Sequence, residues 1–169
     1  MMNTNVDPGQ YQAFHEDCGI VDFRHRTQIE LTGTDRATFL HNLCTADIKC
    51  LSPGEGCEAF LTTVQGKVYG HGLVFCQEDS LVFETAVGQA GRLLPHFDRY
   101  LIREDVQLHD RSQQWGQWLL GGPHCATVLE GVLGLAPLSE KMFATQQWNI
   151  NGGVTGTLRR VPMIQGSCF

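Results

Sequence analysis

The sequence predicts an α+β protein in which antiparallel sheets carry helices on one face and the pattern is duplicated along the chain. Three strand-like runs, at 58–64, 68–75 and 80–87, are joined by short connectors, which favours an antiparallel meander. Stretches with helical spacing of apolar residues follow the strands. The order strand, glycine turn, helix occurs twice, which indicates an internal repeat.

The elements are expected in a regular order behind a polar N-terminal segment that forms an arm or a short helix. Besides the three runs above, β-branched and aromatic residues predict strands at 19–25, 28–32, 106–110, 117–121, 143–148 and 153–164. Apolar spacing predicts helices after an N-cap at Thr34, at 89–101 and at 126–133. Pro95 indicates a late start or a kink in the second helix.

The repeat lies in ELTGTDRATFLHNL (30–43) and LLGGPHCATVLEGV (119–132). When Gly33 is placed on Gly122, the small and apolar residues of the two helices coincide. The elements on either side also recur in the same order, so duplication is the preferred interpretation.

The repeat predicts three segments: an N-terminal arm at 1–16, a first repeat at 17–104, and a second repeat at 105–169 that is truncated after about two strands. An incomplete second half leaves an unpaired sheet edge. Either the missing strands lie on another copy, which predicts a homo-oligomer, or the chain continues beyond Phe169.

Composition argues against several classes of protein. The 169 residues are 42 % hydrophobic and 18 % charged, with a net charge of −6. The acidic balance disfavours a nucleic-acid partner. No apolar run is long enough to span a bilayer, and the first ten residues lack the pattern of a signal peptide. The seven cysteines form no C-x-x-C and the seven histidines no H-x-x-x-H, so we expect reduced cysteines, a cytoplasmic protein and no metal site.

Three stretches contain motifs in a specific order and spacing: GIVDFRHRTQIELTGTDRATFLHNLCTADIKCLSPGEG (19–56), TTVQGKVYGHGLVF (62–75) and HFDRYLIREDVQLHDRS (96–112). Together they resemble the glycine-cleavage T-protein superfamily. This superfamily comprises folate-dependent aminomethyltransferases with their iron–sulfur-assembly and tRNA-modification relatives. The resemblance runs from about residue 14 to 160 and corresponds to the N-terminal portion of such proteins.

The resemblance implies a folate-binding fold of two β-β-α-β-β-β-α halves with swapped strands, which agrees with the repeat. It implies tetrahydrofolate or a derivative as cofactor, bound in a channel between the halves. It also implies that an aminomethyl carbon is transferred to tetrahydrofolate, with a lipoyl carrier protein as a partner.

The chain departs from the transferases at their acidic residues. The resemblance places two consecutive aspartates of the transferases on Gly70 and His71, and the second is the catalytic acid. His71 is therefore the candidate catalytic residue, because a neutral imidazole accepts one hydrogen bond and titrates near physiological pH. A structural role for a histidine in a strand is the alternative. The family asparagine on the next strand falls at about Ala86, and Glu84 is either a new contact or a side chain that faces solvent.

The stretch QGKVYGHGLVF (65–75) is the candidate cofactor site. It lacks the spacing of a phosphate-binding P-loop, and Gly66 is expected in a hairpin turn. Strand alternation places Gly70 and Gly72 on one face and Tyr69 and His71 on the other. The two glycines leave room for a flat ring such as a pterin, or for close packing by the protein. The candidate cofactor contacts are Gly66, Tyr69, Gly70, Gly72 and Glu84.

A basic step, Arg24-His25-Arg26, either meets the glutamate tail of a folate or ends a strand in solvent. The preferred function is a tetrahydrofolate-binding protein of the aminomethyltransferase superfamily that lacks efficient transferase activity. An active folate-dependent aminomethyltransferase is the first alternative. The second is a scaffold or iron–sulfur-assembly factor that kept the fold.

Overall fold

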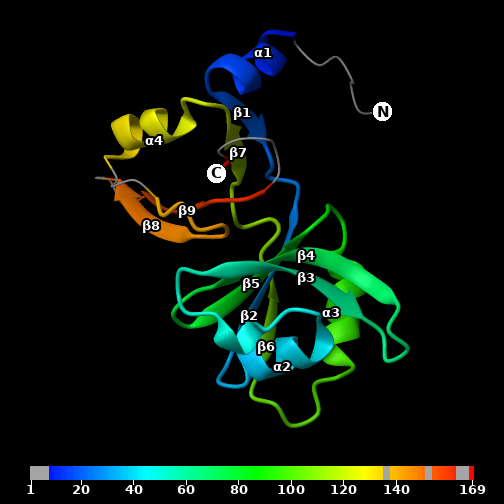
Figure 1. The fold of residues 1–169 in the computed structure, drawn as a ribbon. Helices are drawn as coiled ribbons and strands as arrows, with labels where there is room; N and C mark the ends of the chain where they lie inside the picture. Colours follow the sequence, from blue (N-terminus) through cyan, green and yellow to red (C-terminus); the bar gives the residue numbers. More distant parts are fainter. Residues whose placement is uncertain (1–7, 135–137, 151–153, 163–167) are drawn as a thin grey trace. The chain divides into compact units, whose positions relative to one another are not determined.

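A computed structural model describes residues 8–134, 138–150, 154–162 and 168–169. The chain forms two compact units (Figure 1): the larger is residues 24–117, and the smaller combines residues 1–23 with 118–169. The N-terminal end of the predicted arm, 1–7, and the ends of the last predicted strand, 153 and 163–164, lie outside the described residues.

The larger unit is built on a five-stranded antiparallel sheet in the order β3-β4-β5-β2-β6. Its strands are β2 (Thr27–Thr32), β3 (Gly56–Thr62), β4 (Val68–Cys76), β5 (Ser80–Thr85) and β6 (Gln107–Asp110). The neighbouring positions of β3, β4 and β5 confirm the meander, because connectors of five and three residues leave no room for a crossover.

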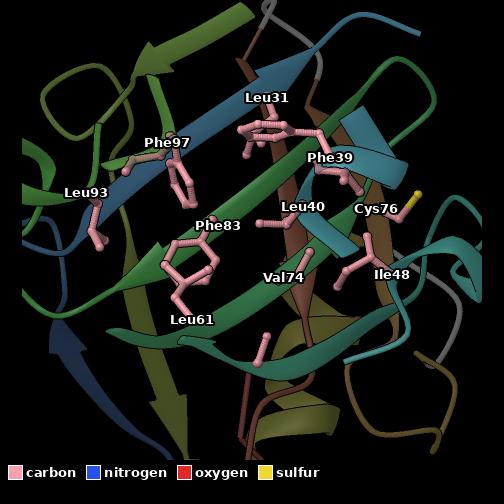
Figure 2. Close-up of a cluster of buried hydrophobic side chains, with 13 residues drawn as sticks. Leu31, Phe39, Leu40, Ile48, Leu61, Val74, Cys76, Phe83, Leu93 and Phe97 are labelled. Carbon is pink, nitrogen blue, oxygen red and sulfur yellow. The ribbon is translucent and has the colours of Figure 1, made fainter. Parts of the chain in front are cut away.

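Helices cover one face of this sheet and enclose its core. They are α2 (Arg36–Leu43), the short 3₁₀ helix η1 (Ile48–Cys50) and α3 (Ala90–Asp98). Figure 2 shows Phe39 and Leu40 from α2 packed with Leu93 and Phe97 from α3 over the sheet residue Phe83. These side chains are nearly inaccessible, so this face is the hydrophobic core of the unit.

The described residues of the smaller unit form two antiparallel strand pairs, β1 with β7 and β8 with β9. Its elements are α1 (Pro8–Glu16), β1 (Gly19–Asp22), β7 (Trp118–Gly121), α4 (Cys125–Leu133), β8 (Thr145–Ile150) and β9 (Val154–Arg159). Cys125 and Leu129 of α4 pack against Phe169 in a second apolar cluster. In the described ranges, no helix is long and apolar enough to cross a membrane.

The two predicted repeats exchange their first strands. β1, which opens the first repeat, pairs with β7, and β6, which opens the second, pairs with β2. This pairing is compatible with the swapped arrangement that the resemblance implies. The spatial units therefore do not follow the predicted repeat boundaries, which remain a prediction.

The same turn occurs in both units. Gly33 (φ +98°) lies so close to the Asp105 carbonyl oxygen that an added Cβ would be 2.1 Å from it. Gly122 (φ +131°) has the same relation to the Asp17 carbonyl oxygen, at 2.4 Å. Two residues after each glycine, a backbone N–H donates to that same carbonyl. Only glycine fits this close approach, which is why the repeat is most visible in the sequence at these two positions.

Some predicted boundaries differ from the observed ones. The N-cap of α2 is Asp35 rather than Thr34; the Thr34 hydroxyl instead donates to the Asp105 carboxylate at 2.9 Å. The late start predicted for α3 is wrong, because the helix begins at Ala90 and contains Pro95.

Candidate functional site

The two glycines of β4 are packed by the protein itself. A Cβ on Gly70 would lie 3.3 Å from methyl carbons of Leu61 and Leu93, which belong to the core. A Cβ on Gly72 would lie 2.5 Å from the Glu84 carbonyl oxygen. Of the two alternatives that the sequence left open, close packing therefore accounts for both glycines. Gly66 lies in the β3–β4 turn with φ +74° and open space around it, as expected of a hairpin turn.

Tyr69 does not share a face with His71, so that prediction is wrong. The register between β3 and β4 shifts at Leu61/Thr62, which places Tyr69 in a β-bulge. Its ring stacks on His96 of α3, with centroids 4.0 Å apart, and its hydroxyl donates to the Arg92 carbonyl at 3.4 Å. Alternation fails because a bulge adds a residue to one strand only.

His71 projects from the sheet face opposite the core, where it contacts a carboxylate. Its Nε2 lies 2.7 Å from Oε1 of Glu58, and both side chains are half-exposed. The His71 ring also stacks on Phe60, its partner across the strands, with centroids 4.7 Å apart. The imidazole is thus held in place by a carboxylate and a ring, and its outer half is accessible to a ligand.

Glu84 is buried rather than facing solvent. Its side chain is 1 % exposed and accepts a hydrogen bond from Nε of Arg26 at 2.8 Å. The Arg26 side chain is 19 % exposed, so the solvated strand end considered for the basic step is wrong at this residue. A buried carboxylate needs such a partner because desolvation of an isolated charge is costly.

Gln28 lies beside Glu84 with an unsatisfied acceptor. The two residues are partners across β2 and β5. The Gln28 side chain donates through Nε2 to Gln117 Oε1 at 2.9 Å, while its own Oε1 is buried and accepts no hydrogen bond. A buried unsatisfied acceptor is uncommon in folded proteins and fits a donor from a ligand.

Strand register places these side chains on one face. Leu73 is the cross-strand partner of both Glu58 and Glu84, and Glu84 is the partner of Gln28. Residues that are paired, or two positions apart on one strand, share a face of the sheet. We call this set the outer strip; it consists of Glu58, Phe60, His71, Leu73, Glu84 and Gln28. It offers a hydrogen-bonding imidazole, a carboxylate and an orphan amide oxygen on an apolar background.

A separate cavity lies elsewhere in the larger unit, and none of the predicted site residues line it. Its volume is about 550 Å³, and it is bounded by α2, the β3–β4 turn and the segment after α3. Among the residues that the structure describes, no group of three His, Cys, Asp or Glu side chains is placed to hold a metal ion.

Comparison with known proteins decides the family. The family model described as "GCVT N-terminal domain" matches residues 6–161. The chain belongs to the GCVT N-terminal domain family. The resemblance inferred from the sequence is thereby confirmed.

Relatives of this GCVT N-terminal domain include transferases. The chain is 25 % identical over 118 residues to a putative chloroplastic transferase of Arabidopsis thaliana, covering 69 % of this chain and 27 % of the relative. It is 22 % identical over 121 residues to an aminomethyltransferase of Rubrobacter xylanophilus, covering 72 % of this chain and 32 % of the relative. The chain thus spans about a third or less of the length of these relatives.

A solved structure has the same fold. The glycine cleavage system aminomethyltransferase T of Bartonella henselae matches 85 % of this chain and 39 % of its own, with a TM-score of 0.71 and 19 % identity. This match confirms the predicted mixed fold.

Glu58 and Phe60 were not predicted as neighbours of His71 in this GCVT N-terminal domain, nor was Gln28 as a neighbour of Glu84. The sequence contains part of the information needed to predict these neighbours. Pairing of β3 with β4 across their hairpin places Phe60 opposite His71, but this register can be assigned only when the position of the bulge is known. β2 and β5 are not consecutive in the chain, so the register between them cannot be predicted from the length of a hairpin connector.

Proposed function

We propose that the protein binds tetrahydrofolate, or a derivative of it, on the outer strip and lacks efficient aminomethyl transfer. The observation that carries the proposal is the contact of His71 Nε2 with Glu58 at 2.7 Å. The resemblance assigns a catalytic aspartate to position 71, and here a histidine paired with a carboxylate takes its place.

The described residues fit the polar edge of a pterin. A pterin ring presents N–H donors, and the outer strip offers the Gln28 Oε1 acceptor, which is buried without a partner, next to the Glu84 carboxylate. Phe60, which is 40 % exposed, supplies aromatic surface for the ring. The chemistry supplied by bound tetrahydrofolate would be a nitrogen that accepts a one-carbon unit.

The proposed loss of efficient transfer follows from the charge of the side chain at position 71. An ionised aspartate is an anion that accepts hydrogen bonds and stabilises developing positive charge. An imidazole is neutral or cationic, so it cannot stabilise positive charge in this way. Glu58 supplies a negative charge nearby, but its Oε1 is engaged with His71.

The same contact favours one second candidate, an active aminomethyltransferase. A carboxylate that orients an imidazole is a recurrent arrangement in general-base catalysis. In that case His71 would take the proton and Glu58 would orient the ring. The proposal also includes a lipoyl carrier protein as partner, assembly into a homo-oligomer and a cytoplasmic location.

The test is a calorimetric titration of the protein with 5-formyltetrahydrofolate, followed by an assay of aminomethyl transfer from a lipoyl carrier protein. Saturable one-to-one binding without transfer is expected. Gln28→Leu is expected to weaken binding at least tenfold, while Gln147→Leu, an exposed position on β8, leaves it unchanged. Binding with efficient transfer would establish the second candidate. No binding at millimolar ligand would refute the proposal and leave the scaffold role.

A further inference from the structure

Two cysteines of the smaller unit have their sulfur atoms in contact. Cys125 Sγ lies 3.0 Å from Cys18 Sγ, although the residues are 107 positions apart in the chain. Cys18 immediately precedes β1, and Cys125 is the first residue of α4. Both are free thiols.

The backbone next to each cysteine is held in place by the recurring glycine turn. His124 N donates to the Asp17 carbonyl oxygen at 3.0 Å. Asp17 directly precedes Cys18, and His124 directly precedes Cys125, so this hydrogen bond holds the backbone beside both cysteines. Gly122 packs against the same carbonyl, with room for no side chain. The approach of the two sulfurs is therefore set by main-chain contacts. In a disulfide the sulfurs are about 2.0 Å apart, which small side-chain rotations can achieve from this starting point.

We propose that Cys18 and Cys125 are a modification site at which a peroxide-class oxidant forms a reversible disulfide. With hydrogen peroxide the step is balanced as two thiols plus H₂O₂ giving one disulfide plus two water molecules. First, the Cys18 sulfur attacks a peroxide oxygen; the O–O bond breaks, Cys18 becomes a sulfenic acid and the first water leaves. Then the Cys125 sulfur attacks the Cys18 sulfur, and the displaced hydroxide leaves as the second water with the proton of Cys125.

The environments of the two thiols determine the order of these steps. Cys125 is buried, whereas Cys18 is partly exposed. Burial raises the pKa of the Cys125 thiol to about 12, so little of it is ionised near neutral pH. Cys18 therefore meets the oxidant first, because its sulfur is the more accessible of the two, and Cys125 acts as the resolving thiol.

The bond would hold the exchanged strand in place. Cys18 is joined directly to β1, and β1 pairs with β7 only through the four residues from Gly19 to Asp22. The disulfide would tie the start of this strand to α4 and close a loop that contains all of residues 24–117. A cross-link that closes so long a loop restricts the unfolded chain and raises thermal stability.

The experiment is peptide mapping after brief treatment of the protein with a slight excess of hydrogen peroxide, with free thiols then alkylated. Trypsin leaves each of the three cysteines of this unit on its own peptide: Cys18 on 1–24, Cys125 on 112–141 and Cys168 on 161–169. A cross-linked pair 1–24 with 112–141 that disappears on reduction is expected. The melting temperature of the oxidised protein should rise by about 5–15 °C and return to its starting value with dithiothreitol.

Two cysteine variants test whether the cross-link and the rise in melting temperature come from Cys18. Cys18→Ser should abolish both the cross-link and the rise in melting temperature, whereas Cys50→Ser, an exposed cysteine of the larger unit, should change neither. If Cys18→Ser does not fold, the wild-type peptide map alone decides. Absence of the 1–24 with 112–141 pair, or a pair of 112–141 with 161–169 in its place, would overturn the proposal.

Discussion

Replacement of Gly72 by alanine tests how β4 is packed. The new Cβ would lie 2.5 Å from the Glu84 carbonyl oxygen and 2.7 Å from the Phe83 ring. Neither neighbour can move easily, because Gly72 faces Thr85 across the β4–β5 ladder and Phe83 is fully buried in the core. Alanine at this position therefore requires the two strands to separate locally.

The expected magnitude combines two opposing effects. Overpacking of a filled site costs about 1–3 kcal/mol. Replacing glycine within a strand returns about 0.5–1 kcal/mol of conformational entropy. A Cβ 2.5 Å from a backbone oxygen lies at the severe end of this range, so overpacking outweighs the entropy gain. The net loss in free energy of unfolding is about 1–2.5 kcal/mol, which lowers the melting temperature by about 2–10 °C for a chain of this length.

The matched control is Gly70→Ala on the same strand. Its Cβ would lie 3.3 Å from the side-chain methyl carbons of Leu61 and Leu93, so these neighbours need to shift by only a few tenths of an ångström. The free energy of unfolding should change by less than about 0.5 kcal/mol, since slight crowding opposes the entropy gain.

The assay is urea unfolding at constant m-value, in which the midpoint reports the change in stability. Equal midpoints for Gly72→Ala and wild type would refute the reasoning. They would mean that β4 and β5 are not in close contact at Gly72 and that this position has room for a ligand.

Three further predictions concern ion pairing, pH and catalysis. Arg26→Met should lower the free energy of unfolding by about 3–5 kcal/mol because Glu84 is left buried without this partner; most of the loss should be recovered in the double variant with Glu84→Leu, and urea unfolding checks both. Burial and the neighbouring arginines lower the pKa of His96 below its ordinary value of 6.5, so the unfolded chain binds more protons and stability is lost as pH falls below 6.5. His96→Phe, which keeps a ring against Tyr69, should flatten the dependence of melting temperature on pH between 7 and 5, and an unchanged slope would contradict this role. His71→Asp should create aminomethyl transfer that neither wild type nor His71→Ala shows, and equal inactivity of all three in a transfer assay would contradict the assigned cause.

Local features of the fold could be predicted from the sequence. The β3–β4–β5 meander depends on short connectors and turn residues, and these act within a few positions of the chain. The duplicated turn was visible at Gly33 and Gly122, because a close approach to a carbonyl with positive φ leaves glycine as the residue that fits.

The candidate site was predicted only in part. His71 was identified from its place in a resemblance, and its position on the outer face follows from strand alternation. Its partner Glu58 and the ring of Phe60 required the register of the hairpin. Tyr69 was assigned to the wrong face because a single bulge changes the face of the residue that it displaces.

By itself, the sequence determined the class of fold, the recurring glycine turn and the family, because these depend on patterns of residue type along the chain. Only the tertiary structure decided that Glu84 is buried against Arg26, that the glycines of β4 are filled by protein atoms, and that Cys18 meets Cys125. Each of these contacts joins residues that are far apart in sequence or on different strands. Their geometry depends on pairing registers and on the exchange of β1 and β6, which local propensities do not encode.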